Sequence, residues 1–133
     1  MQAFRSAIEA QDFDAVEALL AEDVVFTSPV VFKPYHGKAI TAAIVRAVAR
    51  VFEDFRYERA IGEADGSDHA LLFAARVGDR EISGCDILHL DEWGRIDELT
   101  VMVRPLSGAR ALQAAMSAQF ERITQEVQAR SGG

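Results

Sequence analysis

Hydrophobic residues recur every three or four positions in much of the first fifty residues, a spacing that predicts helices. Residues 2 to 10 fit a short first helix, and Asp12 is suited to cap a second one directly after it. Gly37 opens a third helix. Between them, residues 24 to 28 are rich in β-branched and aromatic side chains and end at a proline, which predicts a short edge strand.

The period changes after the third helix, where apolar and polar residues alternate as they do in strands with one buried face. Gly78 and Asp79 form a plausible two-residue hairpin turn within this region. Pro105 suits the first position of a terminal helix, whose apolar stripe runs from Leu106 to Val127. The expected strands cover residues 55 to 59, 70 to 77, 80 to 90 and 95 to 104.

This order of elements predicts an α+β architecture, because the helices are segregated from a meander of long strands. We expect a curved antiparallel or mixed sheet wrapped around helices, which would enclose a conical cavity. At 133 residues the chain has the length of one domain. We divide it into a core over residues 1 to 104 and a C-terminal helix over residues 105 to 128.

Composition and charge narrow the classes of partner. Half of the residues are hydrophobic, as in a globular domain. The formal net charge of -7 speaks against nucleic-acid binding, which depends on lysines and arginines that displace counterions from phosphates. No run approaches the roughly 20 apolar residues of a membrane-spanning helix. We therefore expect a soluble, cytoplasmic protein, and the single cysteine, Cys85, agrees with a reducing compartment.

The ordered series EAQDFDAVEALLAEDVVFTSPV, HGKAI and GCDILHLDEWGRIDEL resembles the nuclear transport factor 2-like superfamily, and within it the SnoaL-like proteins and ketosteroid isomerases. The resemblance extends to Arg104. It implies a cone-shaped α+β barrel with a mostly apolar pocket for a small apolar molecule. It also implies a homodimer that forms through the outer face of the sheet.

The alternation in the last predicted strand agrees with such a dimer. Leu99, Val101 and Val103 can line one face of the sheet, while Met102 lies on the other. A sheet that is apolar on both faces needs cover on both. The third helix can cover one face, and a second subunit is the expected cover for the other.

Two of the three groups that ketosteroid isomerases use for catalysis are absent. Those enzymes move a proton with an aspartate base, while a tyrosine and a protonated aspartate stabilise the oxyanion. The resemblance places Ser28 at the position of the base, Phe4 at that of the tyrosine and Asp86 at that of the protonated aspartate. An isolated serine hydroxyl is a poor general base near neutral pH, so the isomerase mechanism is not expected.

Asp86 is the candidate catalytic residue. It lies among apolar neighbours in its strand, so an inward orientation would desolvate its carboxyl group and raise its pKa. A protonated Asp86 could then donate a hydrogen bond or act as a general acid. The alternative is a structural aspartate that is tied to Arg76, Arg104 or the backbone.

The expected ligand-binding residues around this carboxyl group are Phe26, Ser28, Tyr57, Leu99 and Val101. Ser28 has a structural alternative that we favour, in which its hydroxyl bonds to nearby backbone at a turn. The aromatic residues among them also serve as core. The same apolar surface can stabilise a barrel and receive an apolar ligand.

No metal and no cofactor are expected. His36, His69 and His89 show no paired spacing of the kind that metal ligands have. Strand alternation places His89 and Cys85 on the face opposite Asp86, where Cys85 is expected to serve in packing. Two functions therefore stand side by side. One is a cofactor-free isomerase, cyclase or hydrolase acting on an apolar oxygen-bearing compound, and the other is a non-catalytic dimeric ligand-binding or interaction module with a filled pocket.

Overall fold

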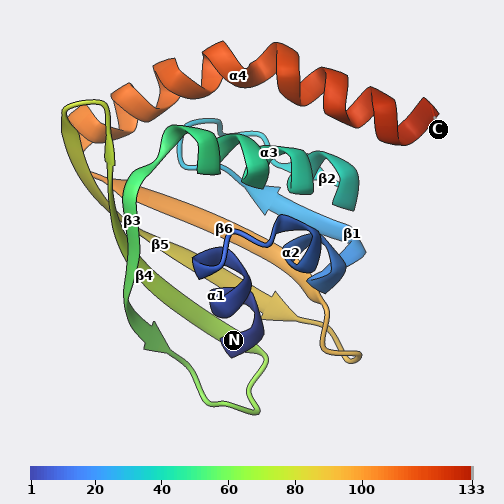
Figure 1. The fold of residues 1–133 in the computed structure, drawn as a ribbon. Coiled ribbons are helices and arrows are strands. Elements are labelled where there is room, and N and C mark those ends of the chain that lie inside the picture. Colours follow the sequence, from blue (N-terminus) through green and yellow to red (C-terminus); the bar gives the residue numbers. More distant parts are fainter. Residues whose placement is uncertain (133) are drawn as a thin grey trace.

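The computed structural model describes residues 1–132, in which a curved mixed sheet wraps around helices (Figure 1). The sheet has six strands in the order β2-β1-β6-β5-β4-β3, and this architecture confirms the predicted α+β class. The elements are α1 (Gln2–Glu9), α2 (Phe13–Leu19), β1 (Leu20–Thr27), β2 (Tyr35–His36), α3 (Lys38–Val51), β3 (Glu53–Ile61), β4 (Asp68–Val77), β5 (Arg80–Leu90), β6 (Ile96–Arg104) and α4 (Leu106–Gly132).

The helix starts follow from local chemistry. The side chain of Asp12 accepts a hydrogen bond of 3.1 Å from the backbone N–H of Ala15, which caps α2 as predicted. Gly37 precedes α3 with a φ of 113°, a backbone angle that favours glycine. Only residues 10–12 connect α1 to α2, and only Gly37 connects β2 to α3. These short connections keep α2 and α3 close to the elements before them.

The prediction of an edge strand near residues 24 to 28 was wrong in its position within the sheet. β1 spans eight residues and pairs in parallel with β6 on one side. On its other side it pairs with the two-residue strand β2, through Val25 with His36 and Phe26 with Tyr35. The short β2 is therefore the edge, because the chain after the proline turns back onto β1.

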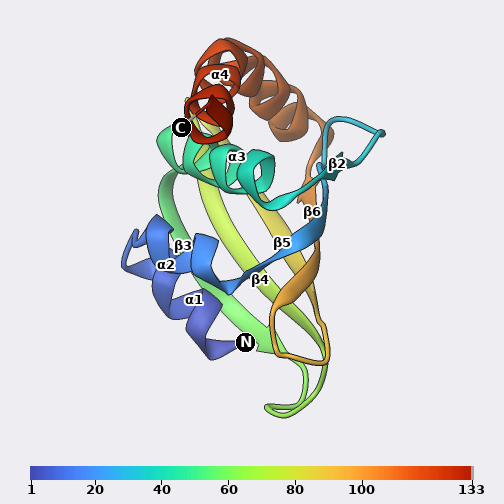
Figure 2. The ribbon, with the colours of Figure 1, turned by 90° about the vertical axis from the view of Figure 1, so that its right-hand side faces the viewer.

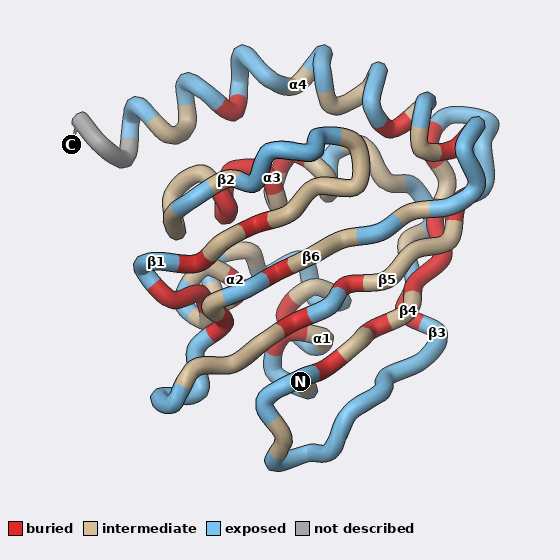
Figure 3. The backbone as a smooth tube through the Cα atoms, turned by 180° about the vertical axis from the view of Figure 1, so that it is seen from behind, coloured by how far each residue is buried: buried red, intermediate tan, exposed pale blue. Residues whose placement is uncertain are grey.

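The register of the long strands sets which side chains face inward. The turn at residues 78 and 79 joins Val77 to Arg80 as predicted. Asp86 is buried with Leu88, whereas Ile87 between them is exposed. Figure 3 shows, from behind, that buried and more accessible positions alternate along β4, β5 and β6.

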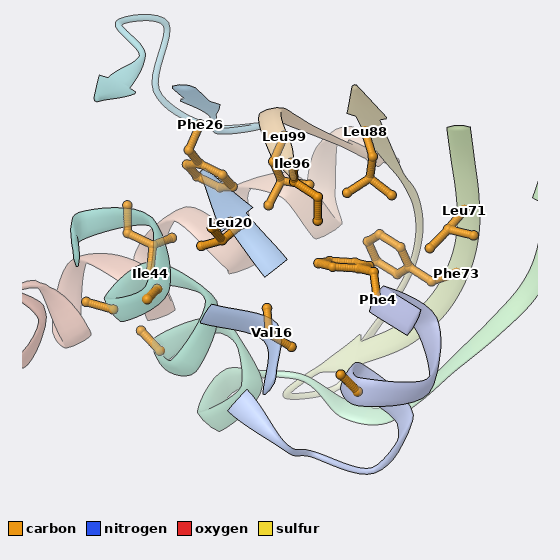
Figure 4. Close-up of a cluster of buried hydrophobic side chains, with 14 of the residues drawn as sticks. Phe4, Val16, Leu20, Phe26, Ile44, Leu71, Phe73, Leu88, Ile96 and Leu99 are labelled. Atoms are coloured by element: carbon orange, nitrogen blue, oxygen red, sulfur yellow. The ribbon is translucent and has the colours of Figure 1, made fainter. Parts of the chain in front are cut away.

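The core lies between the concave face of the sheet and the helices. Figure 2 shows α1, α2 and α3 on one face of the curved sheet, with α4 beyond α3. Side chains from α1, α2, β1 and the long strands point toward one another in Figure 4, with Phe4 2 % exposed and Phe73 1 % exposed. Gly84 leaves room for this packing, since a Cβ there would collide with the ring of Phe73.

The terminal helix α4 is longer than expected and begins one residue after Pro105. It packs on α3, where Arg50 donates hydrogen bonds of 3.0 Å to Gln119 and 3.3 Å to Glu126. Leu112 and Ile123 of the predicted stripe are buried, but Leu106 and Phe120 are 66 % and 48 % exposed. No helix in the described part of the chain is both long and apolar enough to span a bilayer.

Candidate functional site

A cavity of about 500 Å³ lies between the concave face of the sheet and the helices α1, α3 and α4. Most of its wall is apolar. The structure brings together on this wall all six residues that the sequence singled out, namely Phe26, Ser28, Tyr57, Asp86, Leu99 and Val101. They come from β1, β3, β5 and β6 and from the turn after β1.

Asp86 and Tyr57 form a hydrogen-bonded pair on this wall. The hydroxyl group of Tyr57 donates to Oδ2 of Asp86 at 2.7 Å. Asp86 is 8 % exposed, and its strand neighbours are Leu71 on β4 and Val101 on β6. The carboxyl group therefore has an apolar setting and a single strong donor.

Burial raises the pKa of Asp86 from 3.8 to about 6, while the hydrogen bond from Tyr57 acts in the opposite direction. The group is thus largely ionised at neutral pH and protonated in mildly acidic solution. The pKa of Tyr57 is raised by burial and by the neighbouring carboxylate, so its hydroxyl stays protonated. Tyr57 therefore remains a hydrogen-bond donor over the whole working range.

The two arginines that the structural alternative proposed for Asp86 are engaged elsewhere. Arg76 forms an ion pair of 2.5 Å with Asp54, and Arg104 donates to the hydroxyl of Ser83 at 3.3 Å. Among the described residues, Tyr57 is the hydrogen-bond partner of the Asp86 side chain. The bond from Tyr57 agrees both with the candidate acid and with a structural aspartate that serves the internal hydrogen bonding of the pocket.

Tyr57 is held in place by other aromatic rings. Its ring lies edge-on to that of Phe55, with 4.9 Å between centroids, and edge-on to that of Phe73 at 6.4 Å. The guanidinium of Arg5 lies 5.8 Å from the centroid of the Tyr57 ring. These contacts restrict the ring, so the hydroxyl is directed at Asp86.

Ser28 follows the structural reading that the sequence favoured. Its hydroxyl accepts a hydrogen bond of 3.1 Å from the backbone N–H of Val30 and closes a turn. It also lines the cavity, but no partner that would activate it is found among the described residues. Phe4 lines the cavity as well, so neither position supplies the base or the phenol of an isomerase.

Two parts of the wall were missed by the sequence reasoning. The first is the role of Tyr57 as the partner of Asp86, since the irregular pairing of β3 after Tyr57 hides the register. The second is α4, which contributes Leu112, Met116 and Phe120. The apolar stripe of the terminal helix was the available signal, but the sequence does not show where the helix folds back.

The three histidines lie in separate places. His69 is buried and contacts the amino group of Met1 at 3.2 Å, whereas His36 is exposed beside α3. His89 lies on the outer face of the sheet, with its Nδ1 2.6 Å from Oδ1 of Asp97, which raises the pKa of His89. Cys85 shares that outer face, and burial together with the charge of Asp86 raises the pKa of its thiol.

Comparison with known proteins identifies the family. Residues 1–99 match the SnoaL-like domain family. A steroid delta-isomerase from Pseudomonas aeruginosa is 40 % identical, with a TM-score of 0.85 over 92 % of this chain and 89 % of its own. An uncharacterised bacterial protein with a cystatin-like fold, from Silicibacter pomeroyi DSS-3, is 35 % identical, with a TM-score of 0.88 over 98 % of this chain and 91 % of its own.

A more distant structure shares the fold alone. The LEH-like epoxide hydrolase of M. tuberculosis is 24 % identical, with a TM-score of 0.59 over 91 % of this chain and 92 % of its own. No curated protein matches the chain. The family match over residues 1–99 and the agreement with the first two structures lead to one conclusion: this chain belongs to the SnoaL-like domain family and has the nuclear transport factor 2-like fold.

Proposed function

We propose that this chain binds a small, largely apolar, oxygen-bearing compound and acts on it as a cofactor-free isomerase, cyclase or hydrolase. Asp86 serves as the acid or hydrogen-bond donor. The observation that carries the proposal is the Asp86 carboxyl group, held 2.7 Å from the Tyr57 hydroxyl on the wall of an apolar cavity.

The chemistry of the pair supports an acid at this place. Tyr57 occupies Oδ2, so a proton on Asp86 resides on Oδ1 and can be donated to a ligand oxygen. A pKa of about 6 allows both proton donation and recovery of the proton near neutral pH. The apolar wall excludes water, which strengthens a hydrogen bond to a developing oxyanion. The name of the 40 % identical relative, a steroid delta-isomerase, agrees with an apolar substrate that bears oxygen.

Because Ser28 cannot serve as a general base, fewer types of reaction fit this site. When Asp86 protonates an epoxide or ether oxygen, that C–O bond can break as water or a nucleophilic group of the substrate itself forms the new bond, and the proton released by the nucleophile returns to the Asp86 carboxylate. Ring closure, ring opening and acid-assisted rearrangement fit this scheme. Removal of a carbon-bound proton by Ser28 does not.

The test compares the wild type with Asp86→Asn on a panel of cyclic enones and epoxides. Turnover is followed by chromatography, and binding by calorimetry. We expect Asp86→Asn to abolish turnover or binding, and Glu22→Gln to leave both unchanged because Glu22 is exposed and lies outside the cavity wall. Equal activity in wild type and Asp86→Asn would refute the proposed role.

The second candidate is a non-catalytic, dimeric ligand-binding or interaction module. It is favoured by Ser28 and Phe4, which replace two catalytic groups of the isomerases. One version of this candidate has the cavity filled by the protein's own side chains. The cavity volume of about 500 Å³ instead supports the version in which the cavity is open to a ligand. Under this candidate, Asp86→Asn leaves both turnover assays and ligand binding unaffected.

We further propose a homodimer through the outer face of the sheet. Leu72, Cys85 and Met102 form one row across β4, β5 and β6, and Met102 is 57 % exposed. One end of this face carries Asp68, His89 and Glu98, and the other carries three arginines, Arg56, Arg76 and Arg104, together with Glu53 and Glu81. A two-fold axis that crosses the strands places the acidic end of one subunit on the basic end of the other, which gives charge complementarity.

We also propose a cytoplasmic location. Cys85 is the single cysteine of the chain and is a free, partly buried thiol on the outer face of the sheet. In a reducing compartment such a thiol persists without a partner. Cell fractionation followed by thiol labelling tests this, and recovery of the protein in an oxidising compartment would contradict it.

A further inference from the structure

The charged side chains on the cavity wall all have the same sign. Glu9, Asp54 and Asp86 line the cavity, and no lysine, arginine or histidine in the described part of the chain does so. The whole chain has a net charge of -7, so the surroundings do not reverse this local field. An anionic ligand that entered the cavity would meet carboxylates on its wall and no basic side chain there.

The three carboxylates differ in how they are compensated. Glu9 pairs with Arg5 at 3.5 Å, and Asp54 pairs with Arg76 at 2.5 Å, with the acidic side chains 46 % and 68 % exposed. Asp86 is buried and pairs with no cation among the described residues. The causes of its pKa shift are burial and the Tyr57 hydroxyl, and no basic side chain is among them. Asp86 is therefore the carboxylate on this wall whose charge is left for a ligand to balance.

One oxygen of Asp86 is open to the cavity. Oδ2 accepts from Tyr57, while no described residue donates to Oδ1. In the described part of the chain no fully buried side-chain nitrogen or oxygen lacks a partner. Oδ1 is therefore reached from the cavity that Asp86 lines. A donor brought by a ligand has a free acceptor at this point.

Aromatic rings on the wall of the cavity favour the same kind of ligand. Phe52, Phe55 and Tyr57 line the cavity, with 5.8 Å between the centroids of Phe52 and Phe55 and 4.9 Å between those of Phe55 and Tyr57. The faces of aromatic rings attract cations, and this attraction grows when the cation is desolvated. A cation in the cavity would thus gain from the Asp86 carboxylate and from rings on the same wall, of which Phe52 and Phe55 are free of the Arg5 guanidinium that lies over Tyr57.

We infer that the cavity is selective for charge and binds an organic cation, namely an apolar amine whose ammonium group donates to Oδ1 of Asp86, while it rejects carboxylates and phosphates. The inference rests on the proposed function only insofar as the cavity binds an apolar molecule. It extends that function because ionised Asp86 receives an ammonium group, whereas protonated Asp86 donates to a neutral oxygen.

Binding of an ammonium group to ionised Asp86 and binding of a neutral oxygen to protonated Asp86 have opposite dependence on pH. Leu71 and Val101 lie beside Asp86 in the sheet, and the titratable or charged groups near it are Tyr57, Cys85 on the opposite face of its own strand and, near Tyr57, Arg5 and Glu9. Tyr57 stays protonated because its pKa is raised, so the charge that changes around a pH of about 6 is that of Asp86. As the pH rises and Asp86 ionises, the protein should therefore bind an amine more tightly. It should bind a neutral oxygen acceptor more weakly, because that acceptor needs the proton on Asp86.

Three probes with one ring system test the inference: 2-naphthylmethylamine, 2-naphthylmethanol and 2-naphthoate. Each is titrated into the full chain by isothermal calorimetry at about pH 5 and about pH 8, where the amine remains protonated and the naphthoate is mainly ionised. With an Asp86 pKa of about 6, we expect the amine to bind about tenfold more tightly at the higher pH. At the higher pH the naphthoate should bind at least about tenfold more weakly than the alcohol, because it meets an uncompensated carboxylate.

Variants separate the carboxylate from the general charge of the protein. Asp86→Asn keeps the shape of the side chain and should remove both the preference for the amine and its pH dependence. Glu22→Gln removes one charge outside the cavity wall and should change neither. Tyr57→Phe deletes a bond that lowers the pKa of Asp86, so the pH midpoint of amine binding should move upward.

The possible results are distinct. Naphthoate binding as tight as amine binding, or equal amine affinity in wild type and Asp86→Asn, overturns the inference. If the alcohol binds and the amine does not, the charge selection is wrong while the proposed binding of neutral oxygen compounds stands. If none of the three probes binds, the inference is overturned together with the proposal that the cavity takes apolar ring compounds.

Discussion

Tyr57 on β3 and Asp86 on β5 are joined by a hydrogen bond of 2.7 Å, although β4 lies between their strands in the sheet. The bond passes over the concave face, where the curvature of the sheet brings the two side chains together. Phe73 and Leu71 are the residues of β4 that pair with Tyr57 and Asp86. The apolar residues of this strand contribute to the burial that raises the pKa of the carboxyl group.

The first prediction concerns this bond. Tyr57→Phe removes the donor that favours the ionised carboxylate, so the pKa of Asp86 should rise above about 6. The measurement is a carbon-13 NMR titration of the Asp86 carboxyl group. Tyr35→Phe is the matched control, since Tyr35 lines the same cavity and forms no hydrogen bond with Asp86. An unchanged pKa in Tyr57→Phe would show that the bond has no influence on the carboxyl group in solution.

The second prediction is a pH-dependent cost to stability. Between an ordinary pKa of 3.8 and the folded value of about 6, the folded chain holds a proton that the unfolded chain has released. Stability therefore falls as the pH rises through this window, and the full cost, about 3 kcal/mol, is present above it. Asp86→Asn removes this cost.

Urea unfolding of wild type and Asp86→Asn at two pH values measures this effect. The stability of the variant relative to wild type should increase by about 2 kcal/mol from about pH 4.5 to about pH 8. Glu22→Gln should show no comparable change, because its side chain is 90 % exposed. A constant difference between Asp86→Asn and wild type at both pH values would contradict the raised pKa.

The third prediction concerns Gly84, which lies against the ring of Phe73. A Cβ at position 84 would collide with this ring and would lie 2.6 Å from the backbone oxygen of Met102. Gly84→Ala should therefore destabilise the fold by about 1–3 kcal/mol. Phe73→Leu makes space where the ring of Phe73 lies against position 84. The loss of stability in the double variant should therefore be smaller than the sum of the losses in the two single variants. Additive losses in urea unfolding would argue against a direct collision.

The fourth prediction tests the proposed dimer. Met102 is 57 % exposed and lies at the β6 end of the apolar row on the outer face. Met102→Glu would place a charge in the interface and should convert the dimer to a monomer, as measured by sedimentation velocity. Phe120→Glu is the control, since Phe120 is also exposed but lies on α4. A wild-type chain that sediments as a monomer at all concentrations would contradict the proposal.

Most of the fold could be predicted from the sequence, because the patterns that indicate helices and strands are local. The two hydrophobic periods gave the helices and the long strands, and the alternation around Asp86 placed this residue inward and Cys85 outward. Asp12 and Gly37 marked helix starts through their own chemistry. These predictions depend on neighbours within a few residues, and the structure confirms them.

The parts that the sequence did not reveal depend on distant pairing. The parallel contact of β1 with β6 joins segments about seventy residues apart, and no local pattern specifies it. The bond from Tyr57 to Asp86 further requires the strand order and an irregularity in the pairing of β3. Likewise, the path of α4 over α3 leaves Leu106 and Phe120 exposed although both fit the apolar stripe.

The wall that α4 contributes has a consequence for how such proteins diversify. The match to the family ends at residue 99, whereas Leu112, Met116 and Phe120 of α4 line the cavity. A single crossover after the last strand would exchange this wall while Asp86, Tyr57 and the sheet stayed intact. Replacing the terminal segment alone would therefore change one wall of the cavity and leave the scaffold that carries Asp86 unchanged.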